Sequence, residues 1–167
     1  MTGMGPLRFV TTNQGKLDFL RIVLEPVLAT GVVSSVEMCP LDLTEVQAES
    51  FVEICRAKTE EAYRRLGGNV VVQDSGFAIE ELKGFPGPYT KYVLSTIGVD
   101  GLLRLMEGKE NRRCGFMACV GFADSEGKIH IFEEPTPYYG RLVQSTNSVE
   151  RMETTDGRAI GRAWGDG

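Results

Sequence analysis

Residues 7–16 read Leu-Arg-Phe-Val-Thr-Thr-Asn-Gln-Gly-Lys, and they predict the opening of an α/β fold. Leu7 to Thr12 is apolar and β-branched enough for a first strand. The apolar positions that follow are Leu17, Leu20, Val23, Leu24 and Val27. Their helical spacing predicts a helix from about Lys16 to Leu28 with one buried face. Residues 11–16 are therefore expected where a strand turns into a helix, and the free N–H groups at such a turn attract phosphate.

Strands and helices continue to alternate along the chain. The expected strands are Val32–Met38, Val70–Gln73, Arg112–Phe122, Lys128–Phe132 and Tyr139–Val143. The expected helices run from Ser50, which pairs with Glu53 as a capping box, to Leu66 and from Thr90 to Met106 with a break near Gly98. This order predicts an α/β sandwich, in which helices flank a mixed central β-sheet. We expect one α/β domain over residues 1–144 and a divergent segment of uncertain structure over residues 145–167.

Composition narrows the class of protein. The chain has 167 residues, a net charge of −5 and 42% hydrophobic residues, as expected for one soluble globular domain. The negative charge argues against binding to a nucleic-acid backbone. No apolar run approaches the length of about 20 residues that spans a bilayer, and no secretory signal opens the chain. We therefore expect a cytoplasmic protein that binds neither nucleic acid nor membrane.

The four cysteines predict reduced thiols. They are Cys39, Cys55, Cys114 and Cys119, and the one histidine is His130. No pair of cysteines has C-x-x-C spacing, so a structural zinc site is not expected. Buried thiols in a cytosolic protein are the favoured interpretation.

Two carboxylates and two lysines lie at positions suited to a metal and a phosphate. Asp74 follows the apolar run that ends at Val72, and a carboxylate at the carboxyl end of a buried strand faces the ligand crevice of α/β proteins. The following residues, Ser75 and Gly76, suit a tight turn that lets a ligand approach the backbone. A turn without a ligand is an equally good interpretation of this motif.

The loop from Leu41 to Gln47 supplies the other acid. Glu45 is a candidate second oxygen ligand for Mg²⁺, which takes one or two carboxylates together with substrate phosphates. Lys58 on the next helix is a candidate phosphate ligand, as is Lys16 in the first turn. Taken one at a time, each of these residues is better explained by a solvated surface side chain or, at Asn13, by a helix N-cap.

In combination these motifs resemble the inosine triphosphate pyrophosphatase family. The matching segments, in order, are Thr11 to Lys16, Asp42 to Glu45, Lys58, Asp74-Ser75, and Gly84 to Tyr89. The resemblance covers about residues 7 to 143. It implies an ITPase-like or Maf-like α/β fold and a Mg²⁺-dependent homodimer that hydrolyses ITP, dITP and XTP to the monophosphate and pyrophosphate.

The resemblance also implies a role for each matching residue. Glu45 and Asp74 would be the catalytic and metal-binding residues. The substrate-binding residues would be Thr11, Thr12, Asn13, Gln14, Gly15, Lys16, Lys58 and Ser75. Asp74 or a neighbouring acid would orient or deprotonate the attacking water.

The C-terminal part departs from the family pattern, as does one position beside Asp74. Gln73 stands where the family usually has a second acid, and no F-G-[YW]-D-P or S-H-R segment is found. Residues 145–167 are therefore expected to be atypical or truncated. Two alternatives stay open: a Maf-like pyrophosphatase of different base specificity, and a catalytically impaired nucleotide-binding protein. A haloacid-dehalogenase-type phosphatase is poorly supported, because Asp74 lacks D-x-D spacing.

Overall fold

The computed structural model describes residues 4–133 and 138–142 of the chain. These residues form two compact units. Within them, unit 1 comprises residues 4–74 and 119–133, and unit 2 comprises residues 75–118 and 138–142. The predicted division into a domain over 1–144 and a segment over 145–167 stays a prediction, since residues 143–167 lie outside the described part of the chain.

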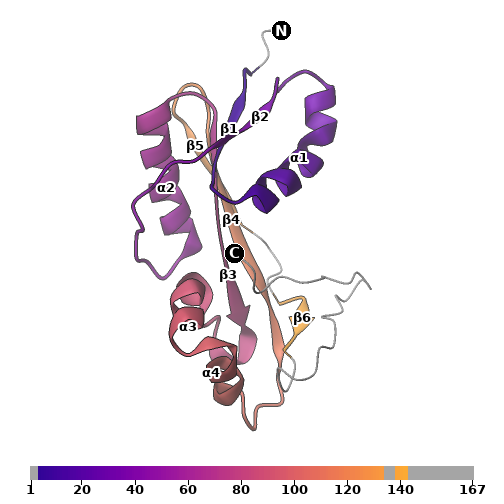
Figure 1. Ribbon diagram of the computed structural model, residues 1–167, viewed down its shortest axis with the longest axis vertical. Coiled ribbons are helices and arrows are strands. Elements are labelled where there is room, and N and C mark those ends of the chain that lie inside the picture. Colours follow the sequence, from indigo (N-terminus) through magenta and orange to yellow (C-terminus); the bar gives the residue numbers. More distant parts are fainter. Residues whose placement is uncertain (1–3, 134–137, 143–167) are drawn as a thin grey trace. The chain divides into compact units, whose positions relative to one another are not determined.

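Strands and helices alternate through the first half of the chain (Figure 1). The strands are β1 (Leu7–Val10), β2 (Val36–Cys39), β3 (Val70–Ile79), β4 (Arg113–Ala123), β5 (Ile129–Glu133) and β6 (Gly140–Arg141). The helices are α1 (Gln14–Ala29), α2 (Phe51–Leu66), α3 (Thr90–Thr96) and α4 (Gly98–Leu105), with short 3-10 turns η1 (Glu80–Leu82) and η2 (Gly87–Tyr89). The break predicted near Gly98 separates α3 from α4.

The sheet is mixed, as the sequence predicts. Its strand order is β2-β1-β3-β4-β5, with β6 also paired to β4. β1 pairs in parallel with both β2 and β3, whereas β4 pairs antiparallel with β5 and β6. β3 and β4 are long enough to contribute residues to both units. The predicted fold class is therefore confirmed.

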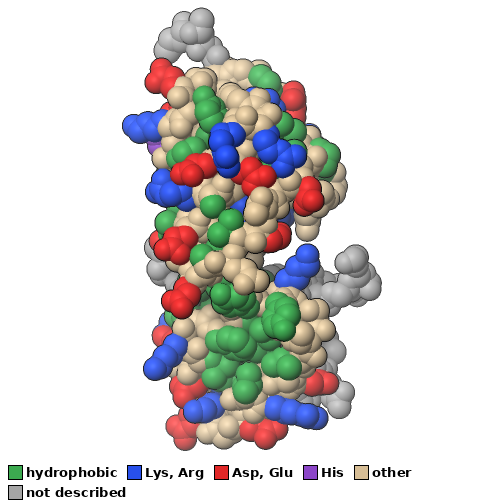
Figure 2. Space-filling model, turned by 90° about the vertical axis from the view of Figure 1, so that its left-hand side faces the viewer, with side chains coloured by type: hydrophobic (Ala, Val, Ile, Leu, Met, Phe, Trp, Pro, Cys, Tyr) green, Lys and Arg blue, Asp and Glu red, His purple; other side chains and the backbone are tan. Residues whose placement is uncertain are grey.

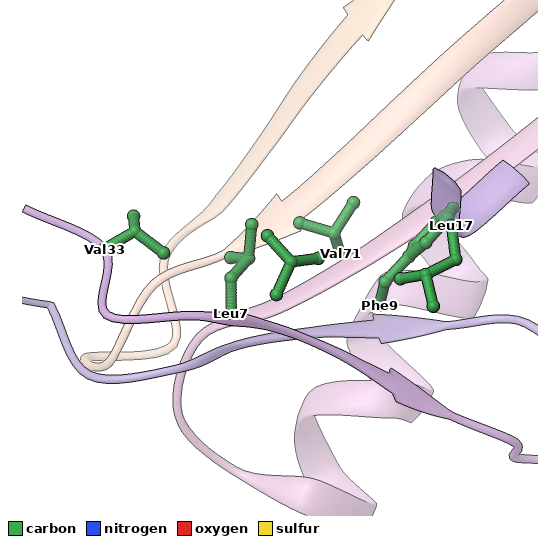
Figure 3. Packing of buried hydrophobic residues seen from close by; sticks show 6 residues of the cluster. Leu7, Phe9, Leu17, Val33 and Val71 are labelled. Atoms are coloured by element: carbon green, nitrogen blue, oxygen red, sulfur yellow. The ribbon is translucent and has the colours of Figure 1, made fainter. Parts of the chain in front are cut away.

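Strand alternation gives unit 1 its three layers. Successive side chains of a strand point to opposite faces, and the middle of β3 follows this rule. Val71 packs in one cluster with Leu17 of α1, whereas Val70 and Val72 pack in another with Ala62 of α2. Leu7 and Phe9 of β1 join the α1 cluster (Figure 3). The sheet of unit 1 therefore lies between α1 and α2 (Figure 1).

Helix α1 buries a narrower face than its sequence predicts. Leu17 is buried, and Leu20, Leu24 and Leu28 pack beside it. The prediction that Val23 and Val27 share this face is wrong, because both are exposed. The four leucines already fill the space against the sheet, so the valines one position away along the helix remain in solvent.

Helix α2 begins and ends where its sequence predicts. The Ser50 hydroxyl accepts a hydrogen bond from the Val52 amide, which satisfies one of the unpaired donors of the first turn. Gly67 ends the helix with a φ of 62°, a conformation that side chains disfavour. The Ser50 cap is confirmed, although its bond goes to the second helical residue and not to Glu53.

Two strand boundaries differ from the prediction by four residues or more. β2 starts at Val36, not at Val32. More importantly, β3 does not stop at Gln73 but continues to Ile79, so Asp74, Ser75 and Gly76 lie inside a strand and not in a tight turn. The buried run from Phe77 to Ile79 explains the difference, because its burial in the core of unit 2 outweighs the turn preference of the residues before it.

Unit 2 has its own core, built from the second half of β3, the two short helices and β4. Its buried residues are Phe77, Ile79, Val93, Leu102, Met106 and Cys114. The Thr90 hydroxyl ties the start of α3 to β3, since it accepts from the Phe77 amide at 2.7 Å and donates to the Gly87 carbonyl at 2.6 Å. Hydrophobic side chains also gather on the surface of this unit (Figure 2), where Tyr92 of α3 is 68% exposed.

Candidate active site

The turn between β1 and α1 is ordered by its own side chains. The Asn13 side-chain oxygen caps α1 by accepting from the Lys16 amide at 3.1 Å, and the Thr11 hydroxyl accepts from the Asn13 amide at 3.0 Å. Gln14 and Gly15 are the first two residues of α1, where backbone N–H groups lack an acceptor within the helix. The turn therefore keeps two N–H groups and the positive helix end available for an anion.

The Gln14 side chain does not join this turn. Its amide nitrogen donates to Asp18 of the same helix at 2.7 Å. The side chain is therefore held along α1, and only the backbone of Gln14 is available at the turn.

The loop after β2, residues 40–49, alternates between core and solvent. Leu41 and Leu43 pack on the cluster beneath α2, whereas Asp42, Thr44 and Glu45 are exposed. This alternation fixes the path of the loop along α2. It places Glu45 opposite Lys58, two turns into that helix.

Lys58 brings the two predicted carboxylates together. Its Nζ lies 2.7 Å from Asp74 Oδ2 and 3.3 Å from Glu45 Oε2. The two acidic oxygens are therefore at most about 6 Å apart, the sum of those distances. The Lys58 side chain is 13% exposed and that of Asp74 is 21% exposed, whereas the Glu45 side chain is 84% exposed. Glu45 thus forms the outer, more solvated side of the group.

The pKa values of the two lysines of the site are shifted in opposite directions. Burial alone lowers the pKa of Lys58, but the hydrogen bond and charge of Asp74, with the charge of Glu45, outweigh it and raise that pKa above its usual value. Burial lowers the pKa of Lys16. The negative charge of Asp74 opposes this shift, and the positive charge of Lys58 reinforces it. Lys16 therefore lies close enough to Asp74 and Lys58 to interact with both charges.

A pocket of about 550 Å³ opens beside this group in unit 1. Its lining residues are Val10, Thr11, Thr12, Pro40, Leu41, Asp42, Leu43, Glu45, Lys58, Val72 and Gln73. All but Lys58 of α2 come from the end of β1 and the turn after it, the loop after β2 and the first half of β3. Parallel strands present their carboxyl ends at one edge of a sheet, which is the usual ligand-binding edge of α/β folds.

The predicted substrate-binding residue Ser75 does not line this pocket. It is the first residue of unit 2, and it lines a different pocket of about 460 Å³. The other lining residues are Gly76, Thr90, Lys91, Leu94, Ser95 and Phe116. Asp74 and Ser75 are neighbours in a strand and so point to opposite faces.

The acids of the site fit a magnesium ion that also binds phosphate oxygens. They do not fit an ion whose ligands are all protein side chains. Among residues 4–133 and 138–142, no three His, Cys, Asp or Glu side chains gather closely enough to hold a metal ion. Mg²⁺ needs only one or two carboxylates when phosphate oxygens and waters complete its shell. Glu45 and Asp74 provide that number of carboxylates within reach of a single ammonium group.

The cysteines and His130 lie largely as the sequence predicts. All four cysteines are free thiols, and three of them are buried. His130 lies on the hairpin strand β5, where it contacts Asp124 at 3.2 Å. It belongs to the hairpin and not to the pocket.

Sequence reasoning did not find two residues that hold the Glu45 loop. The Glu61 carboxylate accepts from the Thr44 amide at 3.0 Å, and Arg65 donates to the Asp42 carbonyl at 2.6 Å. The sequence feature that could have identified them is their i,i+4 spacing on α2, which allows the ion pair that they form.

The profile of the Ham1 family matches residues 7–151. The chain belongs to the Ham1 family. This match spans the β1–α1 turn, the loop with Glu45 and the β3 segment with Asp74.

Similar proteins include two dITP/XTP pyrophosphatases and an inosine triphosphate pyrophosphatase. The protein of Methanopyrus kandleri is 41% identical over 74% of this chain and 63% of its own length. That of Thermococcus kodakarensis is 37% identical over 75% of this chain and 65% of its own length. The inosine triphosphate pyrophosphatase of Kluyveromyces lactis is 31% identical over 82% of this chain and 69% of its own length. The chain thus spans slightly less than two-thirds of the length of these two dITP/XTP pyrophosphatases.

Solved structures of Ham1 proteins share the fold. The HAM1 protein of Coxiella burnetii superposes with a TM-score of 0.68 at 17% identity, over 85% of this chain and 75% of that one. The dITP/XTP pyrophosphatase of Mycobacterium abscessus gives a TM-score of 0.64 at 23% identity, over 83% of this chain and 73% of that one.

Proposed function

We propose that this Ham1-family protein hydrolyses non-standard purine triphosphates (ITP, dITP and XTP) to the nucleoside monophosphate and pyrophosphate, with Mg²⁺ as the metal. One observation carries the proposal: Lys58 bridges Glu45 and Asp74 beside a pocket that the threonines after β1 help to line. The names of the relatives from Methanopyrus kandleri and Kluyveromyces lactis support the choice of substrate.

The triphosphate would be bound by charge and by backbone amides. Lys16 and Lys58 supply two ammonium groups for phosphate oxygens. The amides of Gln14 and Gly15 at the start of α1 supply further donors. Thr11, Thr12 and Asn13 shape the turn, and the Thr11 and Asn13 side chains keep the turn amides in place by the bonds described above.

Glu45 and Asp74 would hold the magnesium ion together with phosphate oxygens. When bound, the metal supplies a Lewis acid that polarises the phosphates and offsets the charge developing on pyrophosphate. Asp74 is the better fixed of the two acids, because its side chain is 21% exposed against 84% for Glu45.

The protein's own groups account for the remaining chemistry. A water attacks the α-phosphorus, so a new P–O bond forms while the bond from that phosphorus to the oxygen bridging to the β-phosphorus breaks. Asp74 orients this water and accepts its proton. The leaving pyrophosphate keeps the electron pair, and the lysines stabilise its charge.

The release of pyrophosphate from purified protein tests this proposal. We expect release from ITP, dITP and XTP with Mg²⁺ and none with EDTA. A panel with ATP, GTP, UTP and dTTP separates this specificity from a Maf-like one. We expect Asp74→Asn to lower kcat by at least about 100-fold, since it removes both a metal ligand and the base. Glu49→Gln, an exposed acid of the same loop, is the control and should keep wild-type activity.

Three results would count against the proposal. Asp74→Asn activity within threefold of wild type would reject the site. Turnover confined to pyrimidine triphosphates would favour the Maf-like alternative. Tight binding of ITP with Mg²⁺ but without turnover would favour an impaired nucleotide-binding protein.

We also propose that the protein is a cytoplasmic homodimer. The free thiols support a reducing compartment. No helix in the described part of the chain is long and apolar enough to cross a membrane. The exposed hydrophobic side chains of η2, α3 and the start of α4 support self-association (Figure 2): Tyr89, Tyr92, Ile97 and Val99. Light scattering should give twice the chain mass of 18.4 kDa, and Tyr92→Glu should shift it to the monomer.

A further inference from the structure

We propose that Glu61 and Arg65 form a clamp on α2 that sets the position of the Glu45 carboxylate, and so the affinity of the site for its metal. The inference rests on the proposed function for the role of Glu45. The clamp itself is defined by contacts that do not depend on that role. Glu61 and Arg65 are therefore positioning residues.

The clamp is a continuous chain of hydrogen bonds. Arg65 Nη1 donates to the Asp42 carbonyl at 2.6 Å and to Glu61 Oε1 at 3.1 Å. The other Glu61 oxygen, Oε2, accepts from the Thr44 amide at 3.0 Å. Both oxygens of one carboxylate are thus used, one toward the arginine and one toward the loop backbone.

These bonds fix the loop backbone just before Glu45. They hold a carbonyl and an amide two residues apart, at Asp42 and Thr44, and Glu45 follows directly. The Glu45 side chain is 84% exposed and contacts Lys58 at 3.3 Å. An exposed side chain has many accessible rotamers, so the place of its carboxylate depends on how well its backbone is fixed.

The charge state of Glu61 supports this role. The hydrogen bond from the Thr44 amide, together with Arg65, holds the pKa of Glu61 below its usual value. The carboxylate is therefore ionised at neutral pH, when it is the better acceptor for an amide.

A magnesium titration of the hydrolysis rate measures the effect on the site. We expect Glu61→Ala to raise the Mg²⁺ concentration for half-maximal rate by about tenfold, the lower end for residues that orient metal ligands. The rate at saturating Mg²⁺ should stay within about threefold, because excess metal restores the bound state. Glu61→Gln keeps an acceptor for Thr44 and should stay within about twofold of wild type. Glu60→Ala, an exposed glutamate one position earlier on α2, is the matched control.

Amide hydrogen exchange in the metal-free protein tests the clamp without any activity. We expect the Thr44 amide to exchange at least about tenfold faster in Glu61→Ala than in wild type or Glu60→Ala, because its acceptor is lost. Unchanged exchange at Thr44, or a magnesium titration of Glu61→Ala that overlays wild type, would overturn the inference. If wild-type protein releases no pyrophosphate, the proposed function fails, and the exchange result still decides the clamp.

Discussion

At the scale of single residues, the ammonium group of Lys58 holds the two acids of the candidate site together. Lys58 is largely buried, and its Nζ lies within ion-pair distance of two acids that are 29 positions apart in the chain. Burial of a charge is costly unless it is paired. The raised pKa of Lys58 shows that its partners outweigh this cost, so the lysine keeps its charge.

Lys16 gives the site a pH dependence. Because burial lowers the pKa of Lys16 and partners raise that of Lys58, Lys16 loses its proton first as the pH rises. We expect metal-free binding of a non-hydrolysable triphosphate to weaken as the pH rises through this lowered pKa. Isothermal titration calorimetry at a series of alkaline pH values measures this affinity.

The variant Lys16→Arg provides the control, because an arginine stays charged throughout this range. It should bind with little change over the same pH values. Loss of binding that is identical in wild type and Lys16→Arg would assign the pH dependence to another group.

The sequence predicted most of the site residues but not how they are held. Thr11 was predicted because it follows the first strand, and Asp74 because it follows an apolar run, positions that a parallel sheet brings together. Glu45 was predicted in the loop after the second strand and Lys58 on the next helix. The clamp was not predicted, because Glu61 and Arg65 meet loop residues 17 and 23 positions away. Such a contact depends on how the loop packs, and no local pattern reports it.

At the scale of elements, the packing of α2 against β4 limits which substitutions β4 tolerates. Gly121 of β4 faces α2 within unit 1. A Cβ built on Gly121 would clash with the Thr59 hydroxyl and lie 3.1 Å from Thr59 Cβ and 3.3 Å from the Cys55 carbonyl oxygen. Thr59 and Cys55 are fully buried, so they have little room to move.

We therefore expect Gly121→Ala to destabilise the protein by about 2 kcal/mol, as overpacking of a core does. That corresponds to a fall in Tm of about 4–8 °C for a chain of this size. Urea denaturation followed by circular dichroism measures it. Gly5→Ala is the control, because a Cβ there meets nothing within 4 Å. Equal stability of the two variants would show that α2 shifts away at no cost.

The elements themselves were largely predictable, whereas the length of β3 was not. Periodicity identified α1 and α2 because each carries a regular apolar face. The residues Asp74, Ser75 and Gly76 have strong turn preferences, which predicted an end to the strand. Pairing and burial on both sides of them overrode that preference, a tertiary effect that local sequence does not record.

At the scale of the whole molecule, the two cores decide which thiols react. Cys55 and Cys119 are buried in unit 1 and Cys114 in unit 2, whereas Cys39 is partly exposed. Burial raises the pKa of Cys114 to about 11 and that of Cys119 to about 12, so neither forms much thiolate at neutral pH.

A disulfide reagent should therefore modify one thiol per native chain at pH 8, at Cys39, and four in guanidinium chloride. Spectrophotometry of the released thiolate gives the count, and Cys39→Ser should reduce the native count to zero. Fast modification of Cys114 in the native protein would show that unit 2 opens readily.

The ion pairs of Lys58 have a consequence for the order in which ligands are taken up. A magnesium ion that binds without nucleotide has to compete with the ammonium group of Lys58 for Glu45 and Asp74. A triphosphate changes this competition, because it offers the displaced ammonium a new anionic partner. Under the proposed function, metal and nucleotide thus strengthen each other's binding by the same factor, and the empty protein has little tendency to collect free magnesium.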